Sequence, residues 1–400
     1  MTGRGARVDT KQALRQLGKA LFEQPLSDLL SPSEGLRVEF ERIPMPDRKG
    51  EDTLDEQDPV AEPRTLELPL LVRDGRLRRD PLAASVSPHS LYLGYPLAEA
   101  RRAGPLAFAA LAPLAPAMRT FSRLSGFERV VFVNHWLFVP GPTPEPDPEM
   151  LDSLLERLRG RFPDHALVFS GLTPDCGPLG HDLLLRELRH LGGRPLRRRT
   201  VYLFDPRRTA PGKKGRFVRK QIRRDLDLLE RARNTAVADR DELMARADEL
   251  RDLYEHLYLE RHPTGLNARY GEGFLRALIA SPLSRSIAWQ AESGHLEAFC
   301  STLIWRNTLL WSICGYRGRN ARERGLFRRL YAHDVQIAQS TGCPLLLGAG
   351  NGDFKRFRGA RPIQELDVVF DRHLSPRRRL PWTLMRTLRP AHPMSTEAHS

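Results

Sequence analysis

The residues best suited to chemistry lie in one stretch, residues 296–370, where two turns carry glycines and basic side chains. The first turn contains Arg317, Arg322, Arg324 and Gly325, and a run with helical spacing follows it directly. Backbone N–H groups at a helix N-terminus bind phosphate or pyrophosphate, and nearby arginines strengthen that binding. We therefore expect this turn to hold the phosphate-bearing part of a donor molecule.

The second turn, GAGNGDFKRFRG at residues 348–359, carries Lys355 between two predicted strands. A lysine is a compact positive charge, which suits a phosphate or a developing negative charge. Asp353, two residues earlier, could orient it. The alternative is an ordinary exposed turn lysine.

These turns need strands and helices to hold them. Apolar alternation and turn residues predict strands at 286–291, 296–304, 308–316, 343–348 and 363–370. Leu326, Leu330 and Ile337 share one face of a helix that ends near Gly342. The first turn therefore lies after a sheet edge and at the start of a helix.

An earlier unit, residues 127–205, alternates strand, helix, strand, helix and strand. Its strands are expected at Val130–Val139, 166–172 and 201–205, with amphipathic helices between them. This order is typical of a compact α/β unit.

A basic stretch, residues 206–233, follows, with eleven Lys or Arg against three acidic residues. Val218, Ile222, Leu226 and Leu229 fall on one helical face, and the charges occupy the others. A solvated helix face is one interpretation. The other is a surface for a phosphate-rich partner, including tRNA.

The N-terminal part, residues 1–110, is the least regular. Residues 46–63 are acidic, flanked by proline and poor in large apolar residues, which indicates a disordered linker. Asp74–Gly75 could form a hairpin turn, and Leu14, Leu17 and Leu21 could share a short basic helix. The tail, residues 376–400, is basic and proline-rich and is expected to fray.

Composition limits the functional class. The chain has 400 residues and a net charge of +14, mostly from arginine, which is typical of a GC-rich bacterial genome or of a polyanion-binding face. Its four cysteines lack the spacing of a metal site, so we expect a reduced, cytoplasmic protein without metal. No apolar run approaches about 18 residues, so no membrane span is predicted.

The sequence RERGLFRRLYAHDVQIAQSTG resembles the cofactor motif of the GCN5-related N-acetyltransferase (GNAT) superfamily. The matching residues are Arg322, Gly325 and Phe327, with Ala338 and Gly342 closing the helix. The lysine turn resembles that of the double-GNAT branch, which includes Fem-type aminoacyl transferases. The resemblance implies two tandem GNAT-like mixed α/β halves behind a largely irregular N-terminal extension, with boundaries at 1–110, 111–235, 236–375 and 376–400.

The resemblance also implies roles for single residues. Its acyl-CoA site would contain Arg317, Arg322, Arg324, Gly325, Leu326 and Phe327. Backbone N–H groups of the strand at 311–315 would polarise the acyl carbonyl, and Tyr331 or Tyr316 would act as the acid. Glu297 would act as the base, and Lys355 would lie near the substrate phosphate or the transferred group.

Each of these roles has a structural alternative. Tyr331 and His333 could pack in the core, Glu297 could face solvent, and Cys314 could be a buried structural thiol.

The predicted activity is that of a bacterial N-acyltransferase of the class EC 2.3. It would move an acyl group, with acetyl expected first, from acyl-CoA to an amine of a small molecule or of an envelope or secondary-metabolite precursor. The motif ends in a small residue in acetyl-CoA enzymes, because a small side chain lets the backbone approach the pyrophosphate; here the residue is Phe327. Phe327 therefore keeps two alternatives open, which are aminoacyl transfer from aminoacyl-tRNA and a non-catalytic binding protein. The oligomeric state stays open.

Overall fold

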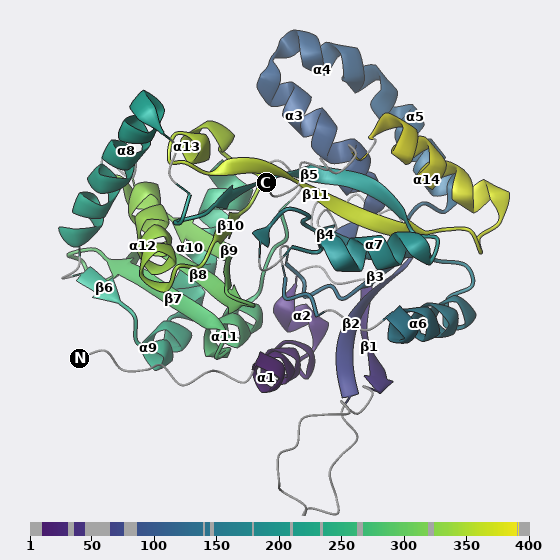
Figure 1. Cartoon of the computed structure of the whole chain (residues 1–400), viewed down its shortest axis with the longest axis horizontal. Coiled ribbons are helices and arrows are strands. Elements are labelled where there is room, and N and C mark those ends of the chain that lie inside the picture. Colours follow the sequence, from purple (N-terminus) through teal and green to yellow (C-terminus); the bar gives the residue numbers. More distant parts are fainter. Residues whose placement is uncertain are drawn as a thin grey trace, which may run out of the picture.

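The structure is a computed structural model that describes residues 10–30, 36–44, 65–75, 86–138, 141–144, 148–177, 180–208, 211–232, 235–261, 267–318, 324–389 and 391. Its described strands form one mixed sheet of eleven (Figure 1). Along the sheet the order is β1, β2, β3, β4, β11, β5, β10, β9, β8, β7, β6. The strands are β1 (Leu36–Pro44), β2 (Thr65–Asp74), β3 (Arg129–Val133), β4 (Ala166–Leu172), β5 (Arg194–Phe204), β6 (Ala236–Val237), β7 (Ser284–Gln290), β8 (Leu296–Trp305), β9 (Thr308–Tyr316), β10 (Leu345–Leu347) and β11 (Arg361–Phe370).

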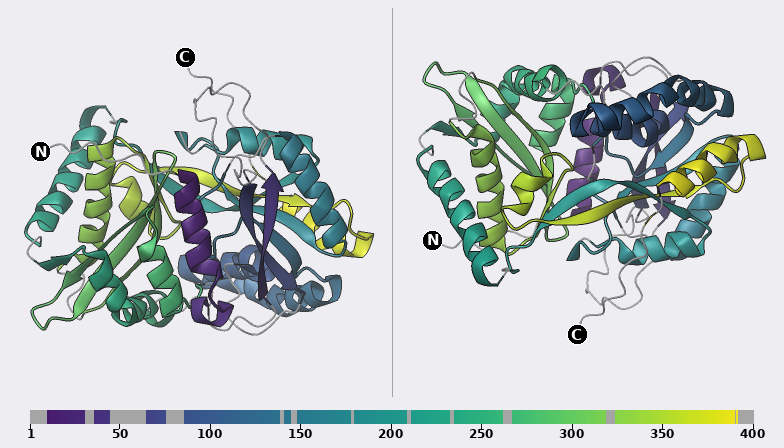
Figure 2. Two further views of the ribbon diagram at one scale, coloured as in Figure 1. Left: turned by 90° about the horizontal axis from the view of Figure 1, so that it is seen from below. Right: turned by 90° about the horizontal axis from the view of Figure 1, so that it is seen from above.

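Helices cover both faces of this sheet (Figures 1 and 2). Those of the N-terminal part are α1 (Thr10–Phe22), α2 (Leu26–Leu29), η2 (Ser90–Gly94), α3 (Tyr95–Ala103), α4 (Pro105–Leu111), η3 (Ala112–Leu114), α5 (Ala115–Ser125), α6 (Pro148–Arg161) and α7 (Asp182–His190). The others are α8 (Gly212–Glu230), α9 (Arg240–Ala245), α10 (Ala247–Glu255), η6 (His256–Arg261), α11 (Glu272–Ala280), α12 (Leu326–Thr341), α13 (Gly352–Arg356) and α14 (Pro376–Leu388).

The α/β class predicted from the sequence is confirmed, and the order β3, α6, β4, α7, β5 matches the predicted first unit. One strand was predicted too long, because β3 ends at Val133 rather than at Val139. Asn134 and Leu137 both have positive φ, of 58° and 67°, which ends the extended conformation. The apolar residues that follow, including Trp136 and Phe138, are buried in a loop instead.

The two halves exchange strands. β11 comes from the C-terminal part of the chain, yet it lies between β4 and β5 and is antiparallel to both. β5 in turn pairs with β10 through Tyr202, Leu203 and Phe204. The sheet is therefore continuous from one half to the other.

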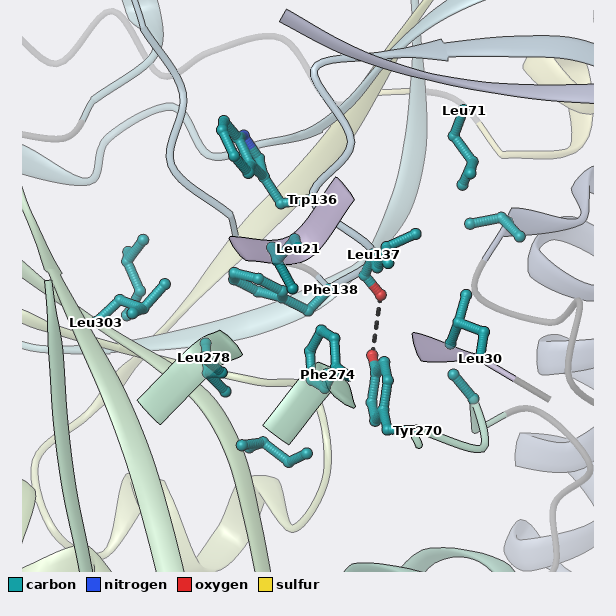
Figure 3. Packing of buried hydrophobic residues seen from close by; sticks show 14 of the residues in the cluster. Leu21, Leu30, Leu71, Trp136, Leu137, Phe138, Tyr270, Phe274, Leu278 and Leu303 are labelled. Carbon is teal, nitrogen blue, oxygen red and sulfur yellow. Dashed lines mark hydrogen bonds between the residues drawn. The ribbon is translucent and has the colours of Figure 1, made fainter. Parts of the chain in front are cut away.

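One hydrophobic cluster extends through both halves on the same side of the sheet. Figure 3 shows its centre, where Phe138 of the N-terminal half packs near Phe274 of α11, with ring centroids 6.0 Å apart. The Tyr270 hydroxyl donates a hydrogen bond of 2.9 Å to the Leu137 carbonyl. This shared core, together with the exchanged strands, fixes one half against the other.

The N-terminal extension is more ordered than predicted. β1 and β2 form an antiparallel pair that extends the sheet at its edge, and Leu14, Leu17 and Leu21 of α1 are buried. The strand predicted before Asp74–Gly75 is β2, which pairs with β1 and with β3. The predicted linker at 46–63 and the residues just after Gly75 lie outside the described residues.

Two later predictions also need correction. Residues expected to fray form α14, whose Trp382 is 1% exposed and packs edge-on against Phe127, with ring centroids 4.8 Å apart. The lysine turn contains the short helix α13. Both segments contain an aromatic side chain that packs on neighbouring elements, and this packing fixes their backbone. The predicted domain boundaries stay predictions.

Candidate functional site

The strands β9 and β10 form a fork near the middle of the sheet. They run parallel and are in register only at Leu309 and Leu310. On its other edge β9 contains a β-bulge, because Ile313 pairs with Ser301 while Trp311 pairs with Thr302, which leaves Ser312 as the extra residue. A bulge bends and twists its strand. The fork therefore opens beyond Leu310, along the segment predicted to bind the acyl carbonyl.

Lys355 lies at this fork. Its side chain is buried, and Nζ donates hydrogen bonds of 2.5 Å to the carbonyls of Gly348 and Gly350, just after β10. Nζ also lies 5.3 Å from the centroid of the Tyr202 ring. Burial lowers the pKa of the Lys355 ammonium to about 8. The structure thus places Lys355 inside the protein, in contrast to an exposed turn lysine.

The turn that carries Lys355 is tightly constrained. Asn351 adopts a left-handed conformation with φ 54°, and a Cβ atom on Gly352 would lie 2.0 Å from the Tyr202 hydroxyl oxygen. A side chain at position 352 would therefore require the Tyr202 ring to move away from the turn.

Cys314 and Tyr258 complete the inner wall of the fork. The Tyr258 hydroxyl lies 3.3 Å from the Cys314 sulfur. Burial raises the pKa of the Cys314 thiol to about 11, although Lys355 and the Tyr258 hydrogen bond act in the opposite direction. At neutral pH Cys314 is therefore a thiol, as expected for a structural cysteine rather than a nucleophile.

Aromatic side chains fill the space between β9, α12 and α13. Phe327 stacks on Trp311, with centroids 5.7 Å apart, and lies 4.9 Å from Phe354. Tyr331 is 1% exposed and packs edge-on against Phe354 at 5.3 Å. Its hydroxyl has no hydrogen-bond partner among the described residues, and burial raises its pKa. Tyr331 is therefore a core side chain in this conformation.

Tyr316 is the better placed of the two predicted tyrosines. It is only partly buried, and the Arg261 guanidinium carbon lies 5.8 Å from its ring centroid. Its ring centroid lies 6.2 Å from that of Phe327, so it borders the same aromatic cluster. Burial still raises the pKa of its phenol.

The predicted donor turn leads into α12. Gly325 has φ 63°, and a Cβ there would lie 2.5 Å from a Leu228 methyl of α8. The helix begins at Leu326, so Gly325 stays outside it. Arg322 lies outside the described residues.

Glu297 does not have the position of a free base. It is 6% exposed, accepts a hydrogen bond of 2.9 Å from Arg324 Nη2, and lies 3.6 Å from Arg329 Nη1. Two arginines therefore form ion pairs with the Glu297 carboxylate. Arg324, which was predicted to bind the donor, uses its guanidinium for one of these ion pairs. Arg317 stays exposed at the end of β9, where Nη2 donates to the Asp252 carbonyl at 3.4 Å.

The helix α8 links both turns. Its buried Asp225 accepts a hydrogen bond of 2.6 Å from Arg328, next to the donor turn, and another from Arg358, next to the lysine turn. α8 also packs along α12 (Figure 1). An ion pair that is buried in this way holds the helix at one position relative to both turns.

The outer face of α8 is strongly basic. Seven exposed cations have no acidic partner within 4.0 Å in the described part of the chain, and they are Lys213, Lys214, Arg216, Arg219, Lys220, Arg223 and Arg224. Among them Phe217 is 46% exposed and meets Phe357, which is 56% exposed, at 6.1 Å between centroids. Phe357 is two residues from Lys355. We call these seven cations with the Phe217–Phe357 pair the α8 face.

Sequence reasoning missed a buried charge network at the junction of the halves. Arg198 Nε lies 3.2 Å from Glu365 Oε2, and Arg198 Nη1 lies 3.3 Å from Asp367 Oδ2. Tyr92 donates a hydrogen bond to Asp367, and Arg199 donates one of 2.6 Å to Glu365. The signal was present, since charged residues interrupt the apolar strands RPLRRRTVYLF and IQELDVVF.

α12 also carries His333 and Asp334, whose pKa values are shifted by burial. His333 is partly buried, its ring packs edge-on against Trp289 with centroids 6.1 Å apart, and burial lowers its pKa to about 4. Asp334 is fully buried, and its Oδ2 accepts a hydrogen bond of 3.0 Å from Thr302. Within the described ranges no three His, Cys, Asp or Glu side chains gather in a way that could hold a metal ion.

No protein-family model matches this sequence, and no curated protein matches it either. Among solved structures, FemX aligns with 95% of this chain and 98% of its own, at 10% identity and a TM-score of 0.47.

Two further solved structures match in part. The first is the C-terminal DUF2156 domain of an Agrobacterium fabrum protein named as a lysylphosphatidylglycerol synthetase. It aligns with 62% of this chain and 79% of its own, at 15% identity and a TM-score of 0.42. The second is a GCN5-related N-acetyltransferase from Kribbella flavida, which aligns with 75% and 70%, at 12% identity and a TM-score of 0.29.

Proposed function

We propose that this protein is an acyltransferase that transfers an aminoacyl group from aminoacyl-tRNA to an amine. The observation that carries the proposal is Lys355, a buried lysine with a lowered pKa at the fork of β9 and β10. A lysine of this kind is partly neutral near pH 8 and can exchange protons with a reacting amine.

In the proposed reaction the acceptor amine attacks the carbonyl carbon of the ester. Backbone N–H groups of β9 beyond Leu310 polarise the carbonyl oxygen. Neutral Lys355 takes the proton that the attacking nitrogen loses. The C–N bond forms, the ester C–O bond breaks, and the Lys355 ammonium returns the proton to the leaving hydroxyl of the ribose. Tyr316 borders this site and is the second candidate for the proton donor.

Two features favour RNA as the donor. The space between α12 and β9 that would receive the pantetheine arm of acyl-CoA is filled by Phe327 and Phe354. The α8 face lies beside both turns, and it combines unpaired cations with exposed aromatic rings. Cations neutralise phosphates, and aromatic rings stack on unpaired bases, so this combination suits the single-stranded end of an RNA.

Acyl-CoA is the second candidate donor, as the sequence motif implies. Gly325 at the N-terminus of the 16-residue helix α12, with Arg317 nearby, is the supporting observation. Phe354 would have to move for the pantetheine arm to enter. Replacing Phe354 with alanine should then improve acyl-CoA binding, whereas it would not improve RNA binding.

The test compares tRNA binding and aminoacyl transfer in matched variants. The double variant Arg216→Gln/Arg219→Gln removes two cations of the α8 face. Arg186→Gln/Arg189→Gln removes two exposed arginines with the same spacing on α7. Binding of total aminoacyl-tRNA is measured between about 50 and 200 mM salt. We expect the α8 variant alone to reduce the slope of log K against log salt, by about 0.7 to 0.9 for each lost phosphate contact.

Transfer is measured with hydroxylamine as a small acceptor, as the rate above the uncatalysed background. Lys355→Met should abolish this rate and leave tRNA binding unchanged. If acyl-CoA binds tightly and tRNA does not, the second donor is correct. If tRNA binds without any transfer, the protein is a binding protein instead of an enzyme.

A further inference from the structure

A group of helices projects from the N-terminal half on the side away from α8 (Figures 1 and 2). We call α3, α4, η3, α5 and α14 the helical lobe. Seven of the ten large hydrophobic residues that are exposed in the described chain belong to it, namely Leu106, Leu111, Leu114, Leu124, Leu380, Leu384 and Leu388. Single exposed leucines are ordinary on protein surfaces, but this concentration indicates an interaction site.

The segment α4 with η3 is unusual within the lobe. Its sequence PLAFAALAPL contains no charged residue, and none of its residues is buried. Leu106 is 88% exposed and Leu114 is 52% exposed. A helix that folds onto its own protein has one buried stripe and one polar face. α4 has neither, so its apolar surface is available to something outside this chain.

Positive charge predominates around α4, where Glu99 of α3 is the one acidic residue of the five helices. Residues 100–127 contain four arginines and no acidic residue, and residues 372–396 contain six arginines and no acidic residue. Arg101, Arg119 and Arg123 lie within 12 residues of α4 on either side, and no acidic partner lies within 4.0 Å of them in the described chain. Within the lobe, Arg377 of α14 donates a hydrogen bond to the Leu124 carbonyl of α5.

We propose that the helical lobe docks on a membrane surface that contains anionic lipid. Apolar side chains on a projecting helix enter the boundary between headgroups and acyl chains, and arginines beside them attract anionic headgroups. The excess of arginine over acidic residues in the lobe, where Glu99 is the one acidic residue, suits anionic headgroups. None of the residues of α4 is buried by the described chain, so its apolar side chains are free to enter such a boundary. The proposal goes beyond acyl transfer and does not depend on the donor.

The test is flotation of the full-length protein with vesicles of phosphatidylcholine alone or with about one third phosphatidylglycerol. We expect binding to the anionic vesicles, much weaker binding to the neutral ones, and loss of binding as salt increases. The variant Leu106→Ser/Leu111→Ser should weaken binding at least tenfold, since both side chains would leave the apolar phase. The control Leu183→Ser changes a residue of α7 that is 56% exposed, and it should bind like the wild type.

The charge variant Arg119→Gln/Arg123→Gln separates the two contributions. It should weaken binding to anionic vesicles and reduce its salt dependence. Equal binding by the leucine variant and the wild type, or no binding to anionic vesicles, would overturn the proposal. Size-exclusion chromatography at several concentrations measures self-association of the protein. If the leucine variant abolishes self-association and vesicles have no effect, the lobe is an interface between protein copies instead.

Discussion

Replacing Asp334 with asparagine tests how strongly burial perturbs the charge of a carboxyl group in α12. Asp334 lies in α12 and is fully buried. Its Oδ2 accepts a hydrogen bond from Thr302, and its Oδ1 has no partner among the described residues. Burial raises the pKa of the carboxyl from 3.8 to about 7. The ionised form is therefore the unfavourable one in the folded protein.

The magnitude follows from the pKa difference between the folded and unfolded states. A shift of about three units at roughly 1.4 kcal/mol per unit corresponds to about 4 kcal/mol. The folded-state pKa is the higher one. The stability that the neutral carboxyl allows is therefore intact below about pH 4 and is lost as the pH rises to about 7. Asparagine keeps an acceptor for Thr302 and cannot ionise. The variant should therefore gain stability over the wild type across this window.

The measurement is urea unfolding followed by tryptophan fluorescence at several pH values. The variant should exceed the wild type by about 1 to 2 kcal/mol at pH 5 and by about 4 kcal/mol at pH 8. Asp353→Asn serves as the control, since its side chain is 73% exposed, and it should show no such trend. A difference for Asp334→Asn that stays constant between pH 5 and 8 would refute the reasoning.

Two further predictions concern Lys355 and α14. The rate of transfer to hydroxylamine should rise with pH and level off above about pH 8, because neutral Lys355 is the proton acceptor; Lys355→Arg should remove this rise, since arginine does not deprotonate. A pH profile of the same shape in the arginine variant would exclude Lys355 as the base. Trp382→Ala should reduce the free energy of unfolding by about 3 to 5 kcal/mol, because it deletes a ring buried against Phe127. Leu380→Ala, at an exposed position in the same helix, should change it by less than about 0.5 kcal/mol in the same urea titration.

The spacing of apolar residues along the sequence predicted the helices and strands that bury one face. The helix after Gly325, the strands before it and the alternating unit from β3 to β5 were all found by the spacing of their apolar residues. Local signals failed where tertiary contacts decide the conformation. The apolar run up to Val139 predicts a strand, yet Leu137 has a positive φ, and its carbonyl accepts a hydrogen bond from Tyr270 of the other half. The helix α14 was not predicted, because its sequence is rich in arginine and proline and the burial of Trp382 is not evident from the sequence.

The candidate site was predictable only in part. Lys355 and Gly325 were identified by turn chemistry, because glycines mark positions with special backbone geometry. That Glu297 is held by Arg324 and Arg329 could not be predicted, since those partners are about 30 residues away and depend on the exact packing of α12 on β8. The same applies to the ion pair of Arg198 with Glu365, which meet only after the halves exchange strands.

The position of β11 has a consequence for how the chain matures on the ribosome. Residues 361–370 are synthesised after almost all the rest of the described chain, but they lie between β4 and β5. Until they emerge, the facing edges of those two strands lack their partner, and exposed strand edges pair readily with other chains. The first half therefore cannot complete its sheet before the second is made. Isolated fragments that end before residue 361 should aggregate, and only the nearly complete chain should yield soluble protein.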